Sequence, residues 1–273
     1  MNRRPGQRNL VAAVGARALG GIAYLGGMAL MLAQAGRWLL RGIANPKLRL
    51  RRGPLALQMV RVGVRSVGIV SLVQVFIGVI LALQMARPLE PWGQVDKIAN
   101  IIGVAGFRML GPIITAVVLS GFAGASIAAE LGTMVVAEEI EALEAQALSP
   151  VRFLVVPRVL ATFLMMMLLT IIADWMIALG GYLTSLAVLK PQVYIGYWER
   201  MRDQLRVRDF VSGLIMAGVF GLLVSLIGCY EGLRVRGGAE GFGRATTMTV
   251  VYSIVGIIVA ACIFTVIFYV YRF

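Results

Sequence analysis

The sequence predicts an all-α polytopic membrane protein, with an interfacial helix near the N-terminus and five transmembrane helices after it. Hydrophobic residues make up 59% of the 273 residues and charged residues only 14%, against about 25% in ordinary soluble domains. The apolar residues also gather in runs of roughly 20 or more, long enough to cross a bilayer as helices. No soluble core of this size could bury so much apolar surface.

The charged residues point to lipid rather than to nucleic acid. The net charge of +13 comes mainly from arginines that flank the apolar runs, and these are explained by attraction to anionic headgroups. The chain has no histidine, and Cys229 and Cys262 lie in or beside apolar runs without CxxC spacing. We therefore expect no catalytic residue, no metal site and no nucleic-acid partner.

Residues 1–54 form a basic N-terminal region. Positions 18–36 are uncharged, and basic residues stand on both sides of them. This outline is similar to a signal peptide, but the basic residues continue after the apolar run. We expect an amphipathic helix lying in the cytoplasmic interface, with an additional span as the alternative. The break with Lys47, Arg49, Arg51 and Arg52 is the strongest cytoplasmic marker in the chain.

Residues 55–273 are predicted to form a five-helix permease domain. The predicted spans are 66–86, 109–129, 159–189, 210–230 and 249–269. With the basic break inside, an odd number of spans places the N-terminus in the cytoplasm and the C-terminus outside.

The third predicted span is too long to cross a bilayer upright. It runs over 159–189 and carries one charged residue, Asp174. We expect it to tilt, protrude or break, and Gly180-Gly181 is the expected place for a break.

Three polar side chains fall inside predicted spans. Asp174 is a functional-site hypothesis by default, and the alternative is that it lies in a headgroup or water-filled region. For Gln74 and Gln84 we expect hydrogen bonds between helices rather than ligand contacts.

A short acidic segment separates the second and third spans. Val136, Ile140, Leu143 and Ala147 have the spacing of one helical face, which predicts an amphipathic helix over 136–147. Four carboxylates accompany this face: Glu138, Glu139, Glu141 and Glu144. Ser149-Pro150 can end this helix and begin the next, with serine as N-cap and proline at the first position. Such a helix is a docking element for a partner protein or a solvated connection.

Several segments resemble the MlaE/YrbE-type permeases, the membrane subunits of lipid-transporting ABC systems. They are ELGTM at 130–134, EEIEAL at 138–143, SPVRFLVVPRVLA at 149–161 and GGAEGFGRATT at 237–247. The resemblance extends from about residue 62 to residue 268, and the motifs occur in the family's order and spacing.

The resemblance implies a dimeric permease in the inner membrane of a bacterium. It implies a cytoplasmic ABC ATPase docked on 136–147, a periplasmic MCE-domain lipid-binding protein, in many systems a STAS-domain subunit, and a phospholipid held between two permease copies. No GxxxxGK[ST] motif surrounds any lysine here, so no cofactor is expected in this chain, and ATP and magnesium would bind to the partner.

Two further sets of residues are candidates under this resemblance. The side chains expected to contact lipid are Phe76, Val79, Ile80, Leu83, Gln84, Met109 and Leu110. Four of them form one apolar helical face on the first span, which could instead pack on other helices. Glu240 and Arg244 are expected in a cytoplasmic turn, where they could form a pair.

The chain departs from the family pattern at five membrane-level positions. The pattern has charged residues where this chain has Met109, Phe122, Met216, Met248 and Ala261. Losing an interacting set together is physically coherent, because an unpaired charge in a membrane is costly. Either a homodimer, which we favour, keeps an apolar lipid slot, or the chain pairs with a charge-bearing paralogue.

Two other classes of function stay open from sequence. One is a secondary transporter or ion channel that uses Asp174, and the other is a membrane scaffold that transports nothing. The scarcity of ionisable residues inside the spans argues against the first.

Overall fold

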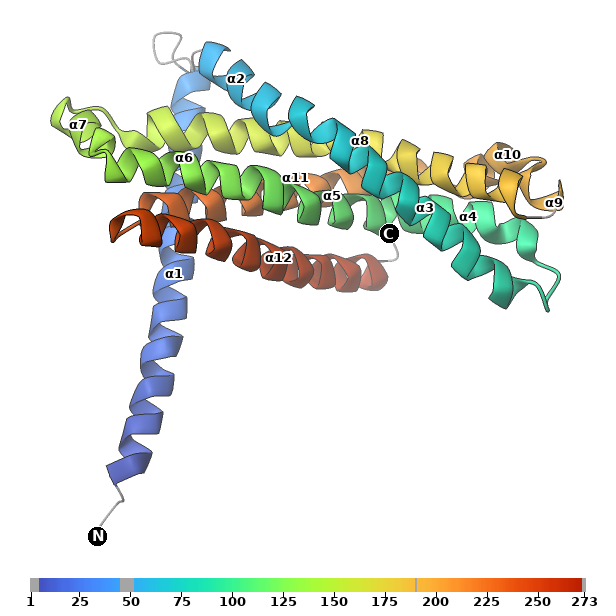
Figure 1. Ribbon diagram of the computed structural model, residues 1–273, viewed down its shortest axis with the longest axis horizontal. Helices are drawn as coiled ribbons and strands as arrows, with labels where there is room; N and C mark the ends of the chain where they lie inside the picture. The colour runs from blue at the N-terminus through green and yellow to red at the C-terminus, as the bar shows by residue number, and fades with distance from the viewer. Residues whose placement is uncertain (1–4, 45–51, 190, 272–273) are drawn as a thin grey trace.

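The computed structural model describes residues 5–44, 52–189 and 191–271, and the regular structure in these ranges is entirely helical. Figure 1 shows long helices running side by side in one elongated bundle, with α1 crossing it steeply. Lys47, Arg49 and Arg51 of the predicted basic break lie outside the described residues.

Six helical segments within the described ranges are long and apolar enough to cross a membrane: Leu19–Gly42, Gly53–Leu89, Val95–Val136, Val151–Ala187, Val207–Leu233 and Glu240–Val270. The last five contain the predicted spans, apart from the final two residues of 159–189. The prediction of an all-α polytopic membrane protein is confirmed.

The first of the six belongs to α1 (Pro5–Ala44). This helix does not run along the bundle, and its N-terminal part extends beyond it (Figure 1). Met31 and Ala35 are buried where α1 meets the bundle, and a Cβ on Gly27 would collide with the Tyr230 ring. A helix set across the spans is the arrangement expected of one lying in the interface, so the interfacial placement stays our prediction.

The second segment is bent near its beginning. It comprises α2 (Arg52–Val62), the 3₁₀ turn η2 (Val64–Ser66) and α3 (Val67–Leu89). Gly63 stands at the bend, where its Cα lies against the Met165 side chain of α8. A larger residue there would push α2 away from α8.

The third segment is one rod with two π-helical turns. Its parts are η3 (Val95–Lys97), α4 (Ile98–Ala105), η4 (Gly106–Leu110), α5 (Gly111–Leu119), η5 (Ser120–Gly124) and α6 (Ala125–Val136). The wider turns shift the faces that α4, α5 and α6 present to their neighbours. Ser120, Gly124 and Ala128 are buried, and Gly124 lies against Val224.

The fourth segment follows the short α7 (Glu139–Ala145) and comprises η6 (Val151–Val155) and α8 (Val156–Ala187). The expected break at Gly180-Gly181 is wrong, because α8 continues through both residues. The glycines are instead contact points: Gly180 lies against the Val75 carbonyl of α3, and Gly181 lies against Tyr197 and Ile102. Glycine weakens a helix, but only glycine allows the backbones of α8 and α3 to approach this closely.

The remaining helices are α9 (Pro191–Tyr194), α10 (Tyr197–Gln204), α11 (Val207–Leu233) and α12 (Gly238–Val270). Tyr197 and Met201 of α10 are buried against the bundle end. The Tyr197 hydroxyl donates a hydrogen bond to the Ala178 carbonyl at 3.2 Å, and burial raises the pKa of its phenol. We call the two ends of the bundle the α7 end and the α10 end (Figure 1).

Candidate functional site

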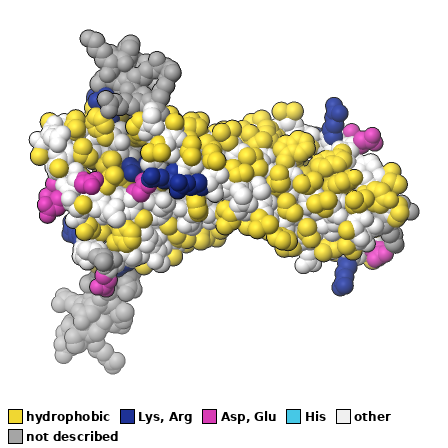
Figure 2. Space-filling view, turned by 45° about the horizontal axis from the view of Figure 1, so that its top comes forward, with side chains coloured by type: hydrophobic (Ala, Val, Ile, Leu, Met, Phe, Trp, Pro, Cys, Tyr) yellow, Lys and Arg dark blue, Asp and Glu magenta, His cyan; other side chains and the backbone are white. Residues whose placement is uncertain are grey.

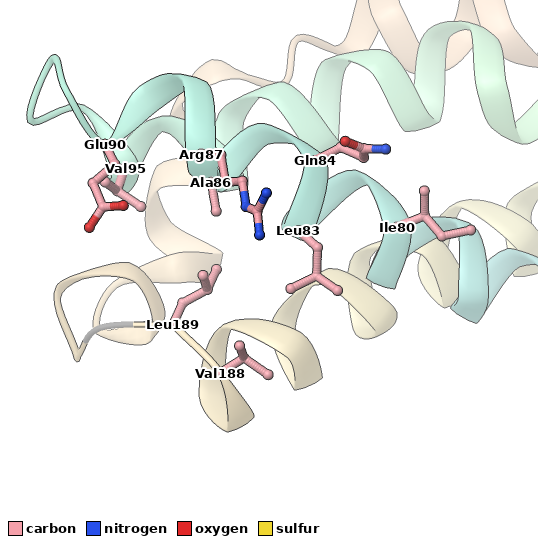
Figure 3. A pocket seen from close by; sticks show the side chains of 9 residues that line it. All are labelled: Ile80, Leu83, Gln84, Ala86, Arg87, Glu90, Val95, Val188 and Leu189. Carbon is pink, nitrogen blue, oxygen red and sulfur yellow. The ribbon is translucent and has the colours of Figure 1, made fainter.

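A cavity of about 610 Å³ opens between the ends of α3 and α8, at the α10 end. We call it the α3–α8 cavity. Its lining residues are Ile80, Leu83, Gln84, Ala86, Arg87, Glu90, Val95, Val188 and Leu189. In Figure 3, Leu83 and Arg87 of α3 point toward Val188 and Leu189, whereas Gln84 points to another side of α3.

The chemistry of this cavity is that of an amphiphile site. Its walls are largely aliphatic, and the guanidinium of Arg87 and the carboxylate of Glu90 also line it. Arg87 follows directly after the predicted span 66–86, at the depth where lipid headgroups begin. An acyl chain along Leu83 and Leu189 would bring a phosphate within reach of Arg87.

A second cavity of about 810 Å³ lies along α4 and η4, and we call it the α4 cavity. It is lined by Leu89, Gln94, Lys97, Asn100, Ile101, Val104, Ala105, Arg108, Met109, Leu110 and Gln204. Arg108 reaches Asp209 of α11 at 3.7 Å and lies over the Phe268 ring at 5.5 Å. The cavity thus has polar and basic groups together with an aliphatic wall.

The structure distributes the seven predicted lipid-contacting residues over both cavities and the outer surface. Ile80, Leu83 and Gln84 line the α3–α8 cavity, and Met109 and Leu110 line the α4 cavity. On the same α3 face, Phe76 is 58% exposed and Val79 is half-buried. Packing within this chain therefore leaves most of the predicted α3 face uncovered.

The predicted amphipathic helix over 136–147 is shorter than expected. Helix α7 covers Glu139–Ala145 only, because Glu138 and Ala147 adopt left-handed backbone conformations with φ of 58° and 57°. Val136 is the last residue of α6. The following helix begins at Pro150 as predicted, and the Ser149 carbonyl accepts hydrogen bonds from the amides of Arg152 at 3.1 Å and Phe153 at 3.3 Å.

The side chains of this segment make the α7 end acidic. The exposed carboxylates are Glu138, Glu139, Glu141 and Glu144, and none of them forms an ion pair with a described residue. Figure 2 shows acidic side chains at this end of the molecule. Ile140 and Leu143 are half-buried and Val136 is 52% exposed, so the apolar side of the segment is partly covered by the protein itself.

Glu240 and Arg244 do not occupy the predicted turn. Both lie in the first turns of α12, and no ion pair links these two exposed residues. The turn is made before them by Gly237 and Gly238, whose φ values of 88° and 68° favour glycine.

Asp174 lies deep in the bundle, with 1% of its surface exposed. It packs against Gly111 just after the π-helical turn η4, where a Cβ would meet its Oδ1 at 2.0 Å. That oxygen has no hydrogen-bond partner among the described residues. Neither cavity described above is lined by Asp174.

The two glutamines of α3 have different surroundings. Gln74 is buried and donates hydrogen bonds to the Gly111 carbonyl at 3.1 Å and to the Thr115 hydroxyl at 2.9 Å. The predicted interhelical role is confirmed for Gln74. Gln84 is exposed instead and lines the α3–α8 cavity.

Sequence reasoning missed an ion-pair network at the α7 end. Glu130 pairs with Arg61 of α2 and with Arg158 of α8, at 3.0 Å for Arg158. Glu130 belongs to the segment 130–134 and Arg158 to the segment 149–161, both of which resemble the permease family. The sequence did not indicate that these two side chains form an ion pair.

Three of the five positions that depart from the family pattern come together. Met216 and Ala261 are buried in one apolar cluster, and Met109 packs against it. Phe122 is 41% exposed and Met248 is half-buried. The apolar residues at 109, 216 and 261 thus belong to or pack against the same apolar cluster.

Taken together, the helices define a multi-pass, all-helical membrane protein. The chain belongs to the MlaE permease family, since residues 55–267 match the family model described as Permease MlaE.

Named relatives agree with this family. A "Probable ABC transporter permease protein" of Rickettsia felis is 36% identical over 212 residues, which are 78% of this chain and 82% of that protein. The "Intermembrane phospholipid transport system permease protein MlaE" of Haemophilus influenzae is 31% identical over 214 residues, with 77% and 81% covered. The chloroplastic "Protein TRIGALACTOSYLDIACYLGLYCEROL 1" of Arabidopsis thaliana is 36% identical, with 74% and 58% covered.

Proposed function

We propose that this permease moves phospholipid between the inner membrane and a periplasmic MCE-domain partner, energised by ATP hydrolysis on a separate ABC ATPase. The observation that carries the lipid assignment is the α3–α8 cavity, where aliphatic walls meet the Arg87 guanidinium. The name of the Haemophilus influenzae relative supports phospholipid as the substrate class.

The lipid assignment is tested by filling the cavity. Leu83→Trp would occupy part of the α3–α8 cavity and should reduce crosslinking of a photoactivatable phospholipid to the purified complex severalfold. Leu72→Trp is the matched control, because Leu72 is 58% exposed on the same helix and does not line the cavity. Equal crosslinking in both variants would remove the cavity from the lipid path.

The ATPase is proposed to dock at the α7 end. Ile140 and Leu143 would supply the apolar anchor, and the unpaired carboxylates would orient the partner and speed association. This proposal is supported by four exposed carboxylates that have no basic partner among the described residues.

Two kinds of variant separate docking from folding. Ile140→Asp with Leu143→Asp should release the ATPase, but both residues are half-buried, so folding must be checked by size-exclusion chromatography. Glu141→Lys with Glu144→Lys alters exposed groups only and should weaken co-purification of the ATPase. Glu199→Lys, at the exposed α10 surface, is the control. Retention of the ATPase at wild-type levels by both double variants would identify α7 as a mere connection.

The assembly is proposed to contain two copies of this chain. The joint replacement of charges at Met109, Met216 and Ala261 by one apolar cluster supports a homodimer that needs no charge-bearing second permease. Native mass spectrometry of the complex from its own host would decide, and two different permease chains in one particle would establish a heterodimer. The same experiment would reveal an MCE-domain protein and a STAS-domain subunit as added masses.

A secondary transporter that uses Asp174 is the alternative. Its support is the buried carboxylate itself, but Asp174 packs against Gly111 and lines neither cavity. If substrate movement required an ion gradient and not ATP, and Asp174→Asn abolished it, this alternative would replace the first proposal.

A further inference from the structure

A third cavity, separate from the two above, lies between α2 and α6 at the α7 end. Its volume is about 270 Å³, and its polar lining comes from Gln58, Arg61, Arg65, Ser126 and Glu130. Phe122 and Ala123 belong to its apolar side. We call it the α2–α6 cavity. Figure 2 shows a group of basic side chains beside acidic ones within the hydrophobic surface of this half of the molecule.

The charges around this cavity do not balance. Glu130 pairs with Arg61 and with Arg158, and it accepts a hydrogen bond from Gln58 at 3.5 Å. Arg65 forms no ion pair with any residue that the structure describes. Two guanidinium groups therefore share one carboxylate, and the third, Arg65, has no carboxylate partner among the described residues.

One of these guanidinium groups is buried and incompletely satisfied. Arg158 has 5% of its surface exposed and binds Glu130 and the Leu154 carbonyl, yet its Nε has no partner among the described residues. Burying an excess of positive charge is costly unless an anion offsets it. Among the described residues the anionic partner of Arg158 is Glu130, which Arg61 also binds; Arg158 does not itself line the cavity and is connected to it through Glu130.

The depth of these groups indicates what the anion is. Arg65 directly precedes the predicted span 66–86, and Arg61 lies one helical turn before Arg65. Glu130 directly follows 109–129, and Arg158 directly precedes 159–189. All four charges thus lie at the edge of the hydrocarbon core, where lipid phosphates are found. Phe122 is 41% exposed beside them, on the side where an acyl chain would continue.

We propose that the α2–α6 cavity binds the phosphate group of an anionic phospholipid through Arg61 and Arg65, with Ser126 as an additional donor. Guanidinium groups suit this ligand because they present parallel N–H donors to phosphate oxygens. The site lies at the opposite end of the bundle from the α3–α8 cavity. The inference rests on the membrane location of the family and not on lipid transport or its direction.

The site is also connected to the α7 helix through Glu130. Glu130 is held to α2 by Arg61, which would also bind the phosphate, and to α8 by Arg158. Glu130 belongs to α6, which leads directly into the α7 segment. A bound phosphate would compete with Glu130 for Arg61. Phosphate binding would therefore weaken the contact that holds the C-terminal part of α6 to α2.

The test measures binding to the intact complex by native mass spectrometry with three probes: phosphatidylglycerol, phosphatidylcholine and inorganic phosphate. Arg65→Gln is the principal variant, because Arg65 is exposed and its loss breaks no described ion pair. Arg61→Gln is the second variant, and Arg202→Gln, an exposed arginine of α10, is the matched control. Transport is not read out, so failure of the proposed function leaves this result interpretable.

The wild-type complex and Arg202→Gln should retain phosphatidylglycerol in preference to phosphatidylcholine. Arg65→Gln should weaken that binding by about tenfold, the loss expected for a hydrogen bond to a charged group, and Arg61→Gln by at least as much. Unchanged phosphatidylglycerol binding in Arg65→Gln would overturn the proposal. If an equal concentration of inorganic phosphate displaced the bound phosphatidylglycerol, the site would take free phosphate, and its assignment to a lipid would be overturned.

Discussion

The crossing of α3 and α8 makes a sharp prediction about two glycines. A Cβ on Gly78 would lie 2.1 Å from the Ile177 carbonyl oxygen, and a Cβ on Gly180 would lie 2.1 Å from the Val75 carbonyl oxygen. An ordinary contact between carbon and carbonyl oxygen is about 3.3 Å or longer. Alanine at either position therefore forces the two backbones apart by more than about 1 Å.

The cost can be worked from this displacement. A gap of about 1 Å removes up to half of the dispersion energy of each contact along the crossing, and overpacking costs about 1–3 kcal/mol. The clashing atoms are backbone oxygens, which cannot rotate away, so the upper part of that range applies. Alanine regains about 1 kcal/mol of helix propensity over glycine. We expect a net loss of about 2 kcal/mol for Gly78→Ala and for Gly180→Ala.

The assay is denaturant or thermal unfolding of the purified chain in detergent, followed by tryptophan fluorescence. Gly68→Ala is the matched control, because Gly68 lies on the same helix and a Cβ there meets nothing within 4 Å. This control should be neutral or stabilising by up to about 1 kcal/mol. The double variant should cost less than the sum of the two single variants, because one separation relieves both clashes. Equal stability of Gly78→Ala and Gly68→Ala would refute the close crossing.

Three further predictions concern other parts of the chain. Met109→Glu should destabilise the protein by about 2 kcal/mol or more, because Met109 packs against an apolar cluster that contains Met216 and Ala261; the midpoint of thermal unfolding measures this, and an unchanged midpoint would mean that the introduced carboxylate finds a partner. Because burial raises the pKa of the Tyr197 phenol in the folded protein, its contribution to stability is present at neutral pH and is lost as the pH rises above about 10; Tyr197→Phe should flatten that part of the curve of stability against pH, and an identical curve would contradict the assignment. A single cysteine introduced at position 94 in place of Gln94 should be labelled from the periplasm by a membrane-impermeant reagent, and one introduced in place of Gln146 should not. Periplasmic labelling of the cysteine at position 146 would contradict the predicted topology.

Sequence reasoning was reliable where the answer depends on local composition. The apolar runs predicted the helical segments, because crossing a bilayer requires only length and hydropathy. The start of a helix at Pro150 was likewise predicted by local backbone chemistry. The interhelical bonds of Gln74 followed from the general requirement that a polar group inside a membrane find a partner, although the identity of that partner did not.

Tertiary structure decided the matters that depend on which segments meet. Gly180 and Gly181 were ambiguous in sequence, because glycine both weakens a helix and allows close approach, and only the position of α3 selects the second role. The left-handed Glu138 and Ala147 shorten α7, an outcome that side-chain periodicity does not encode. Glu130 and Arg61 are 69 positions apart in the chain, so their pairing and the excess positive charge beside them became visible only once α2, α6 and α8 were packed together.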